Sequence, residues 1–140
     1  MSNDSKNNKY VFSVDIEVRD YELDAEGIVN NANYLHYLEY TRHRFCQQAG
    51  YTFGQMTQDG LAPVVNHIEV DYKTPMRSDE VMESKLWVER QGPRFIFHQD
   101  IFNKATGTMA ISALVSIVTL KDGRLSRGDE FQEAFAPYLQ

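Results

Sequence analysis

An α+β fold, with one long helix and a mostly antiparallel sheet, is the architecture that the sequence predicts. Three observations lead to it: an alternating segment over 10–19, helical spacing over 33–49, and four β-rich runs in the remainder. The links between those runs are short, which favours antiparallel neighbours. A sheet wrapped around the helix is one way to bury both elements. The length of 140 residues fits one domain, which we expect over 10–140.

The first strand follows from strict alternation. Residues 1–9 are polar and aperiodic, as is typical of a flexible tail. After them, apolar side chains stand at every second position, at Phe12, Val14, Ile16 and Val18. This period of two predicts a strand with one buried face.

The long helix is predicted over 33–49. Apolar or aromatic residues stand near helical spacing, at 34, 35, 38, 45 and 49. Asparagine at its start suits a cap, and Gly50 lies just past its end. We expect a helix of about four to five turns.

Four further strands and a short helix complete the predicted domain. The β-rich runs cover 64–72, 81–91, 94–103 and 108–120, and a short helix fits 129–135, before Pro137. The last run is apolar on both faces. We therefore expect it to be central in the sheet or covered by a partner subunit.

Composition argues against several classes of function. A formal net charge of -6 argues against binding to nucleic acid, which needs clustered Lys and Arg. No segment approaches the ~18 apolar residues of a membrane span, and the start of the chain has no apolar core of a secretory signal. The single Cys46 fits a reducing compartment, so we expect a cytoplasmic protein. The four histidines do not have metal-ligand spacing, and no metal or cofactor is expected.

The most informative segment is the turn before the long helix, where Asp24 precedes Gly27 by three residues. A carboxylate can act as a nucleophile or as a base that activates water. The unpaired N–H groups of the helix start, at 31–33, can stabilise a developing oxyanion. The alternative is that Asp24 only caps a turn, which is the commoner role of an Asp before a helix.

Residues 18–35, with the run Asp24-Ala25-Glu26-Gly27-Ile28-Val29 at their centre, and residues 37–42 resemble the hot-dog-fold acyl-CoA thioesterases of the 4-hydroxybenzoyl-CoA thioesterase type. Residues 70–75 continue the match more weakly. The resemblance implies a hot-dog fold, with an antiparallel sheet wrapped around one long central helix. It also implies a homodimer or homotetramer with active sites at the subunit interface.

The resemblance also implies roles for individual residues. Asp24 matches the catalytic carboxylate, and the backbone N–H of Asn31 matches the donor that polarises the thioester carbonyl. Gly27 would allow the tight turn between them, and Ile28, Val29 and Tyr34 would lie against the substrate. Coenzyme A carries phosphates, for which Arg90 and Arg94 are candidate partners. Arg124 and Arg127 are further candidates.

Several alternatives stay open at this point. Glu39 could be a helix-borne catalyst, although an ordinary ion pair with Arg42, three residues on, is the expected role. Glu22 could raise the pKa of Asp24. The substrate carrier could be an acyl carrier protein in place of coenzyme A. The protein could also be a hot-dog hydratase, or a non-catalytic subunit that binds acyl thioesters.

Overall fold

The computed structural model describes residues 9–139, so the tail predicted over 1–9 lies almost wholly outside the described residues. The elements are β1 (Phe12–Glu17), η1 (Asp20–Glu22), α2 (Asn31–Gln48), α3 (Phe53–Gln58), β2 (Leu61–Tyr72), β3 (Val81–Gln91), β4 (Arg94–Asn103), β5 (Met109–Lys121), β6 (Arg124–Ser126), α4 (Asp129–Phe135) and η2 (Ala136–Tyr138).

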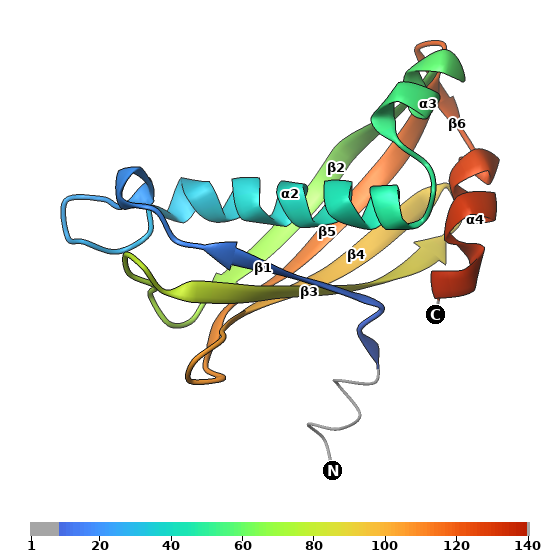
Figure 1. Ribbon diagram of the computed structural model, residues 1–140. Helices are drawn as coiled ribbons and strands as arrows, with labels where there is room; N and C mark the ends of the chain where they lie inside the picture. The colour runs from blue at the N-terminus through green and yellow to red at the C-terminus, as the bar shows by residue number, and fades with distance from the viewer. Residues whose placement is uncertain (1–8, 140) are drawn as a thin grey trace.

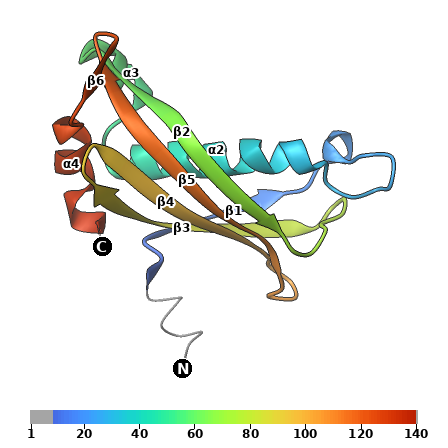
Figure 2. The same ribbon diagram turned by 180° about the vertical axis from the view of Figure 1, so that it is seen from behind.

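The sheet curls around α2, which confirms the hot-dog fold. Its strands stand in the order β1-β3-β4-β5-β2, and β6 pairs with β5. All of these strand pairs are antiparallel. Figure 1 shows α2 lying across the sheet, and Figure 2 shows the strands covering it from behind. The turn between η1 and α2 projects at one end of the molecule, and α4 lies at the other.

Burial of one face of α2 holds the helix against the sheet. Leu38 and Phe45 are fully buried, and the ring of Phe45 packs on Phe97 of β4 and Phe135 of α4. Burying a side chain of this size contributes about 1.5–3 kcal/mol. The helix ends where Gly50 takes a φ of 83°, a left-handed conformation that glycine adopts without strain.

The predicted strands and helices are close to the observed ones. The boundaries of β3, β4 and α4 agree with prediction, whereas α2 begins two residues earlier than expected, because Asn30 and not Asn33 caps it. The two-faced apolar strand, β5, lies between β4 and β2, so its central position explains its composition without a partner subunit. Neither α3 nor β6 was predicted; both are short and lack a long periodic pattern.

The strand β2 forms one edge of the sheet. It pairs with β5 on one side, and within residues 9–139 nothing pairs with its other side. Its apolar side chains are unusually exposed, including Val64, Val65, Ile68 and Tyr72. A long exposed apolar edge is a site at which another strand can pair.

Candidate active site

A tight turn fixes Asp24 just before α2. The backbone N–H of Asp24 donates to the carbonyl of Ile28 at 2.8 Å, and the N–H of Gly27 donates back to the carbonyl of Asp24 at 3.1 Å. Gly27 takes a φ of 78°, which only glycine adopts readily. The Asp24 Oδ1 atom accepts the N–H of Glu26 at 2.8 Å. The turn therefore orients the carboxylate, and its Oδ2 atom accepts no hydrogen bond from residues 9–139.

The start of α2 has one backbone donor left over. The side chain of Asn30 accepts the N–H of Ala32 at 2.9 Å, and the Asn30 carbonyl accepts the N–H of Asn33 at 2.9 Å. Within residues 9–139 the N–H of Asn31 has no hydrogen-bond partner. An unpaired N–H in the first turn of a helix, with the positive end of the helix dipole behind it, is suited to a negative oxygen.

Asp24 and Asn31 line the same hollow, which encloses about 820 Å³ of empty space including its open mouth. Ile28, Val29 and Tyr34, three of the residues predicted to contact the substrate, line it with them, and residues 72–75 and Ala110 complete the lining. Three of the six predicted substrate-binding residues thus lie beside the two predicted catalytic ones. Gly27 shapes the turn that carries Asp24.

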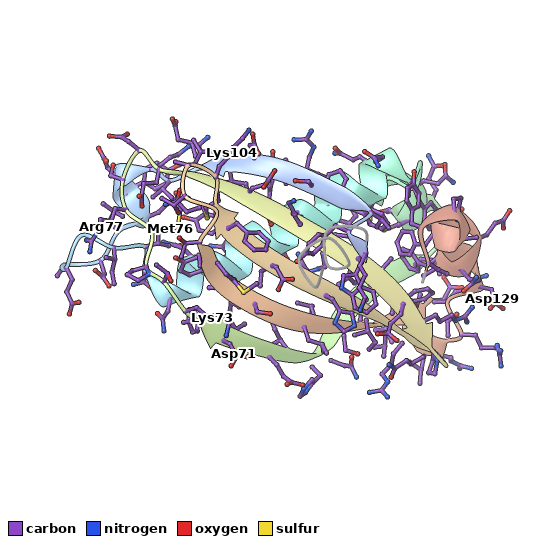
Figure 3. All side chains as sticks on the ribbon, turned by 90° about the horizontal axis from the view of Figure 1, so that it is seen from below. Asp71, Lys73, Met76, Arg77, Lys104 and Asp129 are labelled. Atoms are coloured by element: carbon purple, nitrogen blue, oxygen red, sulfur yellow. The ribbon has the colours of Figure 1, made fainter. Side chains whose placement is uncertain are left out.

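The strand β2 supplies residues that were not predicted as part of the site. The hydroxyl of Tyr72 donates to the Asn31 carbonyl at 3.0 Å. Lys73 follows it, and its ammonium group has no partner within the described chain. Figure 3 shows Lys73, Asp71, Met76 and Arg77 at one end of the molecule. The signal for Tyr72 and Lys73 was their place at the end of a predicted strand, within the weaker part of the family resemblance.

Tyr34 is a buried aromatic residue in the lining of this hollow. Its ring meets those of Tyr72 and Tyr37 edge to face, each with ring centroids 5.7 Å apart. Burial raises the pKa of the Tyr34 hydroxyl to about 12. At neutral pH the group is therefore an uncharged phenol and not a second anion beside Asp24.

Arg90 and Arg94 flank the turn between β3 and β4, which lies at the α4 end of the molecule. The guanidinium of Arg90 is held by Asp129 at 3.2 Å and lies over the ring of Phe95 at 5.3 Å. Figure 3 places Asp129 at the end opposite Lys73. Within one chain these arginines are not brought to Asp24, and their contact with coenzyme A stays a prediction.

Two acidic residues that were weighed as alternatives do not line the Asp24 hollow. Glu22 accepts the N–H of Arg19 at 2.8 Å and does not line the hollow. The expected ion pair between Glu39 and Arg42 is absent, and that prediction was wrong: no carboxylate of residues 9–139 lies within 4.0 Å of the Arg42 guanidinium. Arg42 turns inward to Gln99, whereas Glu39 stays exposed to water.

The described residues contain neither a metal site nor a membrane-spanning helix. No three His, Cys, Asp or Glu side chains within residues 9–139 are placed to hold a metal ion. No helix in the same range is long and apolar enough to cross a membrane.

Comparison with known proteins identifies the family of the chain. The family described as the thioesterase-like superfamily matches residues 18–139. The long-chain acyl-CoA thioesterase FadM of Escherichia coli is 32% identical over 106 residues, which are 75% of this chain and 80% of FadM. The chloroplastic acyl-acyl carrier protein thioesterase ATL3 of Arabidopsis thaliana is 36% identical over 90 residues, which are 64% of this chain and 47% of ATL3.

Solved structures give the same result. The crystal structure of a protein from Aquifex aeolicus superposes with a TM-score of 0.82 at 29% identity. The match covers 88% of this chain and 98% of that one. The family match and the fold therefore rest on nearly the whole described chain.

Proposed function

The chain belongs to the thioesterase-like superfamily and is a thioester hydrolase of the acyl-CoA and acyl-carrier-protein thioesterase family, and on that premise we propose that it hydrolyses acyl-CoA with Asp24 as the catalytic carboxylate. One observation carries the proposal: a carboxylate and an unpaired helix-start N–H line the same hollow. A single buried cysteine fits the reducing cytoplasm, where we propose that the enzyme acts.

The chemistry requires two tasks, and each has a group to perform it. As a nucleophile, an Asp24 oxygen attacks the thioester carbonyl carbon, the C–S bond breaks, and the thiolate of coenzyme A leaves; water then hydrolyses the acyl-aspartyl anhydride. As a base, Asp24 instead takes a proton from water, whose oxygen attacks the same carbon; the C–S bond then breaks, and the free acid and the thiolate of coenzyme A leave. On either route the carbonyl oxygen becomes negative, and the N–H of Asn31 donates to it.

Lys73 is our candidate for contact with a phosphate of coenzyme A. Its exposed ammonium lines the mouth of the hollow and has no partner among residues 9–139. An ammonium is a strongly hydrated point charge that suits a phosphate at a surface. Lys73→Met should raise the KM for acyl-CoA and reduce its salt dependence, with little change in kcat. An unchanged KM would exclude this contact.

A second copy of the chain is proposed along the free edge of β2. This edge is long and apolar, no strand of the described residues pairs with it, and its last residue, Tyr72, lies at the Asp24 hollow. A partner strand would therefore end beside the active site, in a homodimer or in a homotetramer built from two dimers. Sedimentation of the wild type and of Ile68→Lys tests this, since a charge on the edge should produce monomers.

The carrier of the acyl group is tested directly by thiol release. Aliphatic and aromatic acyl-CoA esters and the matching acyl carrier protein esters are offered to the wild-type enzyme at equal concentrations. We expect a higher kcat/KM with the CoA esters. A higher value with the carrier-protein esters would favour the alternative that ATL3 suggests. Loss of enoyl absorbance without thiol release would identify a hydratase.

A further inference from the structure

The loop that carries Asp24 is closed at one backbone carbonyl, that of Glu22. This oxygen accepts two hydrogen bonds, one from the backbone N–H of Asn30 and one from the side-chain Nδ2 of Asn33, each at 2.9 Å. A backbone carbonyl has two lone pairs, so both are used here. Residues 23–29 lie between Glu22 and Asn30, and Figure 1 shows this loop projecting between η1 and α2.

The side chain of Asn33 is not used to cap the helix. Asparagine at this position was expected as the cap, but the side chain of Asn30 caps α2 by accepting the N–H of Ala32. The half-buried amide of Asn33 therefore binds a group outside the helix, eleven positions back at Glu22. Asn33 does not line the Asp24 hollow, so its amide has no place in contact with a substrate there.

The bond from Asn33 joins the supports of the two groups that the reaction uses. Glu22 stands two residues before Asp24, and Asn33 lies in the same first turn of α2 as Asn31. Inside the loop, the N–H of Asp24 is bonded to the Ile28 carbonyl, which shapes the turn but does not tie it to the helix. The Asn33 amide supplies such a tie.

We propose that Asn33 is a positioning residue, which holds the Asp24 loop at the separation from the Asn31 N–H that thioester hydrolysis requires. The inference rests on the proposed function, in which these two groups act on one thioester carbonyl. A displacement of about 1 Å can cost about 100-fold in rate. Because Asn33 and Asn31 share one helical turn, release of the loop shifts Asp24 and leaves the N–H donor in place.

Two variants of nearly the same shape remove the donor. Leucine has no polar side-chain atom, and aspartate has only acceptors at neutral pH. Both suit the first turn of a helix, since leucine is a good helix former and aspartate is favoured near a helix N-terminus. In Asn33→Leu and Asn33→Asp we expect kcat to fall about tenfold, with KM within about twofold of wild type. Wild-type kcat in either folded variant would overturn the proposal.

Asn103→Leu is the matched control. The amide of Asn103 also fixes a loop, because it donates to Glu80 Oε2 at 3.1 Å and accepts the N–H of Ala105 at 3.0 Å, and it does not line the hollow. Its loss should destabilise the protein at least as much as the loss of the Asn33 amide, yet kcat should stay within about twofold of wild type. An equal fall of kcat in Asn103→Leu and Asn33→Leu would overturn the proposal, since kcat would then follow stability.

Amide hydrogen exchange gives a readout that does not depend on activity. The N–H of Asn30, which shares the Glu22 carbonyl with Asn33, should exchange about fivefold faster in Asn33→Leu than in wild type. The N–H of Gln132, bonded to the Gly128 carbonyl in α4, should exchange at the wild-type rate. Unchanged exchange at Asn30 would overturn the proposal, because the loop would then be held without Asn33.

The closing experiment combines Asn33→Leu with Asp24→Asn and measures thiol release from acyl-CoA by wild type, both single variants and the double variant. If Asn33 acts through Asp24, Asn33→Leu should cost about tenfold in the wild-type background but less than about twofold in Asp24→Asn. An equal loss in both backgrounds would overturn the proposal. Wild-type activity of Asp24→Asn would overturn the proposed function and this inference together. An inactive Asp24→Asn beside a fully active Asn33→Leu would overturn this inference alone.

Discussion

The hydroxyl of Tyr72 donates a hydrogen bond to the backbone carbonyl of Asn31 at 3.0 Å. This bond joins the last residue of β2 to the first residue of α2, although 41 positions separate them in the sequence. It fixes the helix start against the sheet edge at the place where the proposed oxyanion donor lies. The geometry of the site therefore depends on β2 as well as on the Asp24 turn.

Removal of this bond should reduce activity more than stability. In Tyr72→Phe we expect kcat/KM to fall by about threefold to tenfold, as a loss of about 1 kcal/mol predicts. Tyr72 is half exposed, so the free energy of unfolding should change little. Thiol-release kinetics and urea unfolding measure the two effects. Tyr21→Phe is the control, since Tyr21 is exposed and lies outside the hollow; equal kinetic effects in both variants would contradict this role.

The N–H of Asn31 can be deleted selectively with proline. Asn31 is the first residue of α2, where proline is tolerated, and Asn30 before it is already extended with a ψ of 134°. Asn31→Pro should fold normally and lose about 100-fold to 1,000-fold in kcat, as the loss of an oxyanion donor predicts. Asn31→Ala keeps the N–H and should stay active. Full activity in Asn31→Pro would exclude this donor.

Gly27 should be required for its backbone conformation and not for space. A Cβ added to Gly27 would meet no heavy atom of the described residues within 4 Å. The φ of Gly27, 78°, is nevertheless strained for alanine. Gly27→Ala should therefore destabilise the protein by about 1–2 kcal/mol, with a further loss of activity if the turn shifts Asp24. Gly54→Ala, at an ordinary helical φ in α3, should be neutral or stabilising by up to about 1 kcal/mol. If both variants changed the free energy of unfolding by the same amount, backbone strain at Gly27 would not be the cause.

Much of the fold follows from local pattern, whereas the site does not. Alternation predicts β1 and the long strands, and the spacing of Tyr34, Leu38 and Phe45 predicts α2. The pairing of β2 with β5 is a long-range contact that no local pattern specifies. For this reason Tyr72 and Lys73 were not assigned to the site, and the inward turn of Arg42 away from Glu39 was not foreseen.

Tyr34 should make the protein sensitive to alkali. Its pKa is raised from 10.0 to about 12, chiefly by burial, so the folded state keeps a proton that the unfolded chain releases. The stabilisation is complete below pH 10 and is lost as the pH rises toward 12, by about 1.4 kcal/mol per pH unit. Urea unfolding at pH 9, 10 and 11 should show a smaller loss in Tyr34→Phe than in wild type. If wild type and Tyr34→Phe lost the same unfolding free energy between pH 9 and 11, Tyr34 would not contribute to the sensitivity to alkali.

The most direct test of Asp24 uses its neighbour as a control. Asp24→Asn and Glu26→Gln each remove one carboxylate from the same turn, but only Asp24 lines the hollow. Thiol release from the best acyl-CoA substrate should fall about 100-fold or more in Asp24→Asn, or roughly 2.7 kcal/mol of barrier, and stay near wild type in Glu26→Gln. Equal activity of Asp24→Asn and wild type, with both folded and equally associated, would contradict the account and move the chemistry to another residue.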